Sequence, residues 1–151
     1  MLFMESAPKL SITELLFEVS LWYKRALTRA AADEDISPPQ AALLWELAPG
    51  KPIAMSVLAE ALACDAANVT GLVNNLEARN LVVRTVSTDD RRVKLLTTTR
   101  AGARVRSRIV AQLITPPPWL MGLSPEDQNM LLDILQRAKA AVGGQRLDFI
   151  A

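Results

Sequence analysis

The sequence predicts a mainly α-helical fold with one small β-hairpin, and the evidence is clearest between residues 65 and 97. The first half of this stretch carries apolar residues at three- and four-residue intervals: Val69, Leu72, Val73 and Leu76. Such spacing indicates a helix with one buried face. Two runs rich in β-branched residues follow, 81–86 and 93–96, and the polar segment 87–92 between them is typical of a turn. A helix followed by a charged hairpin indicates a winged helix-turn-helix, whose helix would enter a major groove of DNA.

The helix-turn-helix unit is predicted from two helical segments that meet at residues 63–65. Ser56 is a suitable N-cap for a helix over 57–62, because its hydroxyl can accept a hydrogen bond from a free amide of the first turn. Asp65 can cap the recognition helix in the same way. Asn80 is expected to end that helix, since asparagine tolerates the left-handed conformation of many helix ends.

Two more helices are predicted on the N-terminal side. Residues 10–32 carry a wide apolar stripe at helical spacing, which indicates one long helix with contacts on more than one side. Ser37 before Pro38 is a helix start, and this helix is expected to run to about Ala48. Residues 53–54 are long enough for a minimal strand.

The C-terminal side is predicted to hold a further helix pair. Residues 97–99 offer three threonines as N-caps for a helix that ends before Thr115, because the prolines at 116–118 cannot continue it. Ser124 followed by proline starts the last helix. Its apolar face is expected to reach Val142, after which a glycine pair stops it.

The outer helices are too apolar to remain in water, so we expect them to pack together and against a second copy of the chain. The prediction is a homodimer in which residues 1–35 and 100–151 form a helical dimerisation region. Residues 36–99 would form the winged helix-turn-helix DNA-binding lobe. Trp119 is expected at the end of the dimer or against the partner chain.

Composition excludes several classes of function. The chain of 151 residues has one cysteine and no histidine, so a disulfide framework, a Cys/His zinc site and histidine-based catalysis are all excluded. We therefore expect no metal, no cofactor and no enzymatic activity. No apolar run of about eighteen residues occurs and the N-terminus lacks the pattern of a secretory signal, which predicts a cytoplasmic protein without a membrane partner.

The distribution of charge indicates where a nucleic acid would bind. The net charge is +1, but residues 84–108 carry eight basic groups against two acidic ones. The excess lies just beyond the predicted recognition helix, where phosphates would be. The alternative is an ordinary solvated basic helix face.

Four segments between residues 36 and 135 resemble those of one known family, in the same order: ISPPQAALLWELA, SVLAEALACDAANVTGLVNNLEARNLVVR, TDDRRVKLLTTTRAG and LSPEDQNMLLDIL. They are similar to the second helix, the helix-turn-helix, the wing and the last dimerisation helix of the multiple-antibiotic-resistance-regulator (MarR) family of bacterial transcription factors. The resemblance implies a homodimer that binds a pseudo-palindromic operator, usually to repress. It also implies release of the operator when a small ligand binds or an oxidation occurs.

Some positions of the recognition helix depart from the family's pattern. Gly71 stands where an arginine is frequent, Asn74 and Asn75 stand where a charged pair is common, and Asn80 replaces the usual glycine. The helix therefore has fewer cations for phosphates. More of the affinity is expected to come from the wing and from the helix after it.

The predicted DNA-binding residues are Ser56, Ala66, Ala67, Asn68, Thr70, Gly71, Asn74, Asp90, Arg91, Arg92 and Lys94. On the recognition helix, asparagine can bond an adenine edge, threonine can reach a phosphate or a thymine methyl, and small residues allow close approach. On the wing, arginines suit a narrow minor groove. The resemblance implies that Arg92 makes the groove contact and that Asp90 helps to hold it. The alternative is a polar helix surface and a solvated turn.

Two further features are candidates for signal sensing. Trp22, Arg25 and Trp45 could line a pocket for an aromatic carboxylate, the class of ligand that the resemblance implies, or both tryptophans could be core or interface anchors. Cys64 could be a redox sensor, since a thiol near a helix start can have a lowered pKa, or it could be a small buried hydrophobe.

The function predicted from the sequence is a dimeric, sequence-specific DNA-binding transcriptional repressor that a small aromatic or other ligand releases from its operator. One alternative is a redox-responsive regulator that uses Cys64. The other is a winged-helix module that binds protein and has no operator. An enzyme is not expected, because the carboxylates are scattered and no nucleophile has a base beside it.

Overall fold

The computed structural model describes the backbone of residues 7–141 and the side chains of residues 11–141, and it is mainly α-helical, as predicted. In chain order the elements are α1 (Ala7–Asp33), α2 (Pro38–Glu46), β1 (Ile53–Ala54), α3 (Met55–Ala61), α4 (Ala66–Ala78), β2 (Val82–Val86), β3 (Lys94–Thr98), α5 (Arg100–Ile114), α6 (Pro118–Met121) and α7 (Pro125–Ala141). The predicted continuation of the last helix to Val142 and its glycine stop lie outside the described residues.

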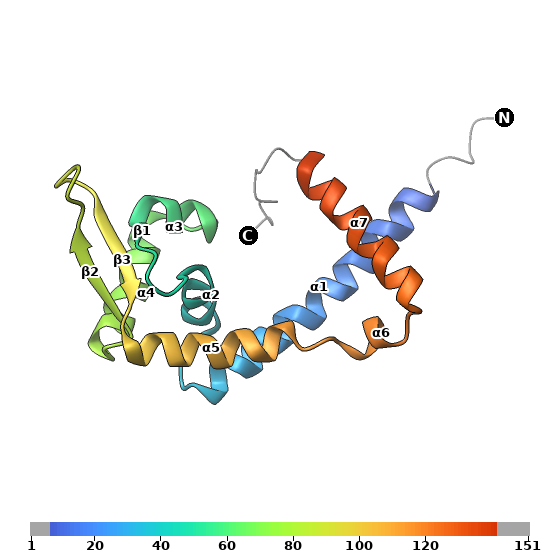
Figure 1. Cartoon of the computed structure of the whole chain (residues 1–151), viewed down its shortest axis with the longest axis horizontal. Coiled ribbons are helices and arrows are strands. Elements are labelled where there is room, and N and C mark those ends of the chain that lie inside the picture. Colours follow the sequence, from blue (N-terminus) through green and yellow to red (C-terminus); the bar gives the residue numbers. More distant parts are fainter. Residues whose placement is uncertain (1–6, 142–151) are drawn as a thin grey trace.

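Figure 1 shows an elongated molecule with the winged helix-turn-helix at one end. α1 and α5 extend from this lobe towards the opposite end, where α6 and α7 follow α5 along the chain. Among residues 7–141, no single helix is long and apolar enough to cross a membrane. α3 and α4 reach that length and composition only as a pair, and the chain bends by 108° between them.

Local capping explains where most helices begin. The Ser37 side chain accepts from the Gln40 amide and the Gln40 side chain accepts from the Ser37 amide, which forms a capping box at the start of α2. The Thr99 hydroxyl accepts from the Gly102 amide at 3.0 Å, so the last of the three candidate threonines caps α5. The Ser124 hydroxyl accepts from the Asp127 amide at 3.1 Å at the start of α7.

Two predictions about element bounds were wrong, and one element was missed. Ser56 does not cap α3, because the helix begins at Met55 with Ala54 in the cap position and without a side-chain cap. α2 ends at Glu46, two residues earlier than expected. α6 was not predicted, although a proline occupies its first turn.

The sheet has three antiparallel strands in the order β1-β3-β2. β1 pairs with β3 at two positions, Ile53 with Leu96 and Ala54 with Leu95. β2 pairs with β3 along its whole length, from Val82 opposite Thr98 to Val86 opposite Lys94. β3 therefore runs two residues further than the predicted strand, because Thr97 and Thr98 have partners in β2.

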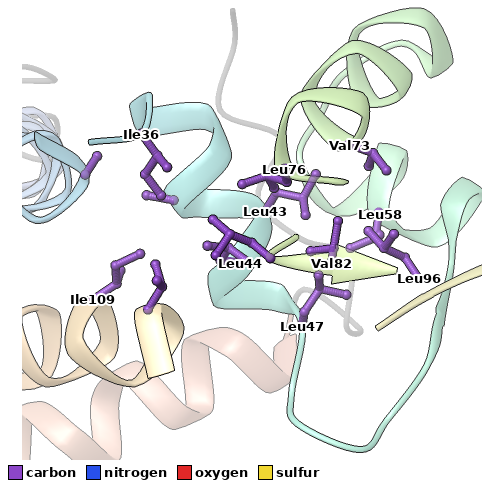
Figure 2. Close-up of a cluster of buried hydrophobic side chains, with 14 of the residues drawn as sticks. Ile36, Leu43, Leu44, Leu47, Leu58, Val73, Leu76, Val82, Leu96 and Ile109 are labelled. Atoms are coloured by element: carbon purple, nitrogen blue, oxygen red, sulfur yellow. The ribbon is translucent and has the colours of Figure 1, made fainter. Parts of the chain in front are cut away.

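One hydrophobic core lies between the helices and this sheet (Figure 2). Its largest fully buried side chains are Leu43, Leu44, Leu47, Leu58, Val69, Val73, Leu76, Val82, Leu96 and Ile109. They come from α2 and the residue after it, from α3 and α4, from β2 and β3, and from α5, so the core joins the helix-turn-helix to the sheet and to α5. Burial of each such side chain stabilises the fold by about 1.5–3 kcal/mol, which fixes α4 against the lobe.

Gly102 explains how α5 approaches the sheet so closely. A Cβ atom on Gly102 would lie 1.7 Å from the carbonyl oxygen of Leu81, which leaves no room for a side chain. The same carbonyl accepts from the Thr99 amide at 3.0 Å. The glycine therefore lets the start of α5 rest directly on the backbone that leads into β2.

Candidate nucleic-acid interface

α3 and α4 form the predicted helix-turn-helix, with a bend of 108° between them. Ala63 in the turn has φ 47°, a left-handed conformation that redirects the chain. Asp65 then caps α4, since its Oδ1 accepts from the Asn68 amide at 2.7 Å. The helix ends as expected at Asn80, which has φ 55°.

The outer face of α4 is exposed along its length, while Val69, Val73 and Leu76 are buried on the inner face. Six predicted DNA-binding residues lie on the exposed face: Ala66, Ala67, Asn68, Thr70, Gly71 and Asn74. No atom lies within 4 Å of a Cβ built on Gly71, so this part of the helix surface is open. Ser56 is exposed too, in the first turn of α3.

The polar side chains of this face already have partners within the lobe. Nδ2 of Asn68 donates to Oδ2 of Asp65 at 3.1 Å. The Thr70 hydroxyl donates to the Ala66 carbonyl at 2.7 Å, so its proton is used within the helix and its oxygen keeps acceptor capacity. Oδ1 of Asn74 accepts from Nη2 of Arg84 at 2.7 Å. These hydrogen bonds favour one orientation of each side chain in the absence of a ligand.

The wing is the turn between β2 and β3. The Ser87 amide donates to the Val93 carbonyl at 3.0 Å, and the Val93 amide donates to the Asp90 carbonyl at 2.9 Å. Oδ1 of Asp90 accepts from the Arg92 amide at 2.9 Å, so the carboxylate shapes the backbone that carries the arginine. Arg91, Arg92 and Lys94 are exposed, and none of them forms an ion pair with the residues that the structure describes.

The structure divides the basic run of residues 84–108 into two groups. Arg84 pairs with Glu77 at 2.6 Å, Arg108 pairs with Glu34 at 2.5 Å, and Arg106 donates to the Trp45 carbonyl at 3.2 Å. These three cations serve contacts within the chain. Five others are exposed and have no acidic partner within residues 11–141: Arg91, Arg92, Lys94, Arg100 and Arg104. Arg106 and Arg108 contact residues 61 and 74 positions away, so the spacing of the basic residues in the sequence does not show this division.

The loop between α1 and α2 connects α4 to α5. Both side-chain oxygens of Glu34 accept from Arg108, at 2.5 and 2.6 Å. The main-chain oxygens of Glu34 and Asp35 accept from the guanidinium of Arg79, at the C-terminus of α4. The hydrogen bonds from Arg108 hold the pKa of the Glu34 carboxyl below its usual value.

An open pocket of about 580 Å³ lies between α1, α5 and the proline connector. It is lined by Trp22, Arg25 and Arg29 of α1, by Gln112 of α5 and by Thr115 and Pro116. Two of the three predicted effector residues therefore meet here. Trp45 lies outside the lining, at the end of α2, where its side chain is 39% exposed.

Cys64 lies in the turn between α3 and α4. Its side chain is half-buried, and Sγ lies 3.2 Å from the Leu62 carbonyl oxygen, to which it donates. The residue packs against the hydrophobic core. Its use as a redox sensor stays a prediction.

Comparison with known proteins identifies relatives of this lobe. A sequence model of the MarR family matches residues 34–93, from the loop before α2 to the wing. A search of curated proteins found no match. A MarR-family transcriptional regulator of Rhodococcus sp. RHA1 is 28% identical, with a TM-score of 0.68 over 83% of this chain and 90% of that one.

Two more distant structures share the fold. MarR of E. coli, in its apo form, is 20% identical with a TM-score of 0.70, over 83% of this chain and 95% of that chain. A MepR variant of S. aureus bound to an oligodeoxyribonucleotide is 20% identical with a TM-score of 0.57, over 87% of this chain and 97% of that chain. The predicted winged helix-turn-helix with flanking helices is thus confirmed.

Proposed function

We propose that the chain is a winged helix-turn-helix transcriptional regulator of the MarR family, and that it binds a specific DNA operator as a homodimer. The observation that supports the proposal is that two exposed surfaces lie next to each other. The outer face of α4 is exposed and made of small and polar residues, while Arg91 and Arg92 extend without acidic partners in the described structure from the neighbouring wing. A helix and a wing of this kind suit the major groove and the adjacent minor groove.

Dimerisation is supported by the apolar surface that the outer helices leave exposed. On α1 this surface includes Leu15, Leu16 and Phe17, which are 54–62% exposed, and α7 has no buried residue at all within its described length. Apolar patches of this kind mark interfaces. We assign dimerisation to residues 1–35 and 100–151 and DNA binding to residues 36–99.

The proposed regulatory role is repression. A dimer would seat its two α4 helices about 34–36 Å apart, in successive major grooves of an operator. An operator that overlaps a promoter would then exclude the polymerase. A protein that acts on the chromosome in this way would reside in the bacterial cytoplasm.

The proposed effector is an aromatic carboxylate in the pocket between α1 and α5. Trp22 offers an aromatic wall, and Arg25 and Arg29 offer cations for a carboxylate. Gln112, in the lining, donates to Asp33 at 3.1 Å, next to the loop that holds Arg79 and Arg108. Ligand binding would thus bias the packing of α1 on α5, and with it the spacing of the α4 helices.

The decisive experiment measures binding of the full chain to duplex fragments from the region upstream of its own coding sequence, at several salt concentrations. We expect saturable binding that weakens steeply with salt, with one protected site in a footprint. Complete absence of binding to these fragments and to random-sequence duplexes would contradict the proposal and favour a protein-binding module.

A further inference from the structure

Arg84 of β2 lies along the recognition helix and contacts three of its residues. Nη1 donates to Oε2 of Glu77 at 2.6 Å, and Nη2 donates to Oδ1 of Asn74 at 2.7 Å and to the Thr70 carbonyl at 3.4 Å. The Arg84 amide donates to Oε1 of Glu77 at 3.2 Å. Positions 70, 74 and 77 share one stripe of a helix, so the guanidinium is fixed by three successive turns of α4.

This contact determines which end of the Asn74 amide faces outward. A guanidinium has donors and no acceptor, so the atom of Asn74 that faces Arg84 must be the carbonyl oxygen. The amide nitrogen, with its two N–H donors, is therefore turned away from the sheet. Asn74 is exposed, so these donors are available to a ligand.

Asn68 is held the opposite way round. Its partner is the carboxylate of Asp65, which accepts but does not donate when ionised, so the atom that faces it must be the amide nitrogen. The carbonyl oxygen of Asn68 is left as the outward acceptor, and the side chain is exposed. The same residue type thus presents opposite polarity at two positions of one helix face.

We propose, on the basis of the DNA-binding function above, that Arg84 is a positioning residue that makes Asn74 a hydrogen-bond donor to the major groove. A two-bond contact of asparagine with adenine uses its oxygen and nitrogen together, and Arg84 occupies one lone pair of the oxygen and holds that oxygen towards the sheet. Asn74 then favours guanine, which presents O6 and N7 as acceptors, or thymine, which presents O4. Adenine also presents N7, but its neighbouring N6 amino group is a donor and does not accept from the amide nitrogen. Asn68, with its free oxygen, favours cytosine or adenine, which present amino donors.

The test is selection of bound sequences from a random-sequence duplex library by the full-length chain. Wild type should prefer guanine or thymine at one base pair of each half-site, and Asn74→Ala should reduce that preference by roughly 2- to 10-fold, as expected for one hydrogen bond. Arg84→Met keeps the aliphatic stem and frees the Asn74 oxygen. It should extend the preference at that same base pair to adenine and leave the other positions unchanged.

Two matched variants test whether a changed base preference in Arg84→Met comes from the freed Asn74 oxygen or from the unpaired Glu77. Arg84→Met/Glu77→Gln removes the unpaired carboxylate that the single change leaves beside DNA, and it should show the same broadened preference as Arg84→Met. Asn68→Ala should reduce discrimination at a different base pair, one that carries cytosine or adenine. Circular dichroism checks whether Arg84→Met folds. If it does not, the base preferences of wild type and Asn74→Ala show whether Asn74 acts as a donor, because Asn74→Ala retains the ion pair of Arg84 with Glu77.

Three outcomes would overturn the inference. They are a wild-type preference for adenine at the position that Asn74 governs, a sequence profile unchanged by Asn74→Ala, and an equal loss of affinity for all sequences in Arg84→Met. In each case the wild type still selects DNA, so the proposed function would stand. A wild-type chain that selects no sequence would overturn both.

Discussion

The guanidinium of Arg108 holds the carboxylate of Glu34 through two hydrogen bonds of 2.5 and 2.6 Å, although the residues are 74 positions apart. Arg108 belongs to α5, and Glu34 lies in the loop that follows α1. The same loop accepts hydrogen bonds from Arg79 at the end of α4. The pair thus joins the helix proposed for dimerisation to the helix proposed to read DNA.

The first prediction concerns the pH dependence of this pair. Arg108 holds the pKa of Glu34 below its usual 4.5, so the pair stabilises the fold above the unfolded-state pKa and loses this effect as the pH falls through the folded-state pKa. Glu34→Gln should therefore lower Tm near neutral pH and leave it almost unchanged in acid. Thermal unfolding of both proteins across this range is the measurement.

The control for the Glu34 variant is Asp133→Asn. It breaks an exposed ion pair with Arg137 on α7, where both side chains are more than 60% exposed. Such surface pairs contribute little to stability. An equal loss of Tm in both variants, or a loss in Glu34→Gln that does not depend on pH, would contradict the prediction.

The second prediction compares two glycines in helices. Gly102→Ala would place a Cβ 1.7 Å from the Leu81 carbonyl oxygen, so we expect α5 to shift and the fold to lose about 3 kcal/mol or more. Gly71→Ala meets nothing within 4 Å and should stabilise the fold by about 0.5–1 kcal/mol. Urea unfolding of both variants measures the contrast. A stable Gly102→Ala protein would show that α5 need not rest on the Leu81 backbone.

Gly71→Ala also tests how closely α4 approaches DNA. If the helix needs an open surface at Gly71, the stabilised variant should bind its operator more weakly than wild type. Fluorescence anisotropy with a labelled operator duplex measures this. Unchanged affinity for the operator would show that α4 does not need the open surface at Gly71 to approach DNA.

The third prediction concerns the wing. Arg92→Ala should weaken binding to every sequence and reduce the salt slope by about 1, because one cation is removed from the negative potential of the minor groove. Thr70→Ala, on the recognition helix, should instead reduce discrimination between operator and random DNA. Arg137→Ala on α7 is the matched control and should change neither. A purely sequence-dependent effect of Arg92→Ala would mean that the wing reads bases.

The fourth prediction concerns assembly. Phe17→Glu places a charge on the exposed apolar face of α1, where Phe17 is 62% exposed, and should convert the dimer into monomers. Val86→Glu makes the same kind of change at a 56% exposed position of β2 and should leave the dimer intact. Sedimentation of both variants distinguishes the two faces. Dimers of Phe17→Glu at all concentrations would place the interface elsewhere.

The fifth prediction concerns the effector pocket. Benzoate is a simple aromatic carboxylate, and its binding beside Trp22 should quench part of the tryptophan fluorescence. Arg25→Ala should reduce the affinity for benzoate, whereas Arg137→Ala should not. Titration of the full chain measures both. Quenching that is the same in all three proteins would show that benzoate binds outside this pocket.

Elements with local signals could be predicted from the sequence, and those that depend on distant partners could not. The caps at Ser37, Asp65 and Thr99 act within three residues of their own position, so the sequence shows them directly. The prediction for Ser56 was wrong because α3 starts directly after Ala54, which pairs with Leu95, and these two residues are 41 positions apart.

The same distinction applies to the candidate site. The exposed face of α4 follows from helical periodicity, and it was predicted correctly as an exposed face. The partners of Arg84 and Arg108 could not be predicted, because nothing local marks Glu77 or Glu34 as their acceptors. Basic residues that look alike in the sequence therefore have different roles in the fold.

The short β1 has a consequence for the dynamics of the wing. β1 supports β3 at Leu95 and Leu96, so the hairpin beyond these residues is a two-stranded ribbon. Such ribbons have little stability of their own. The amide of Val86 should therefore exchange with deuterium through local opening, while that of Leu96 should exchange only when the core unfolds. The wing can thus adjust to the width of a groove while the recognition helix keeps its place.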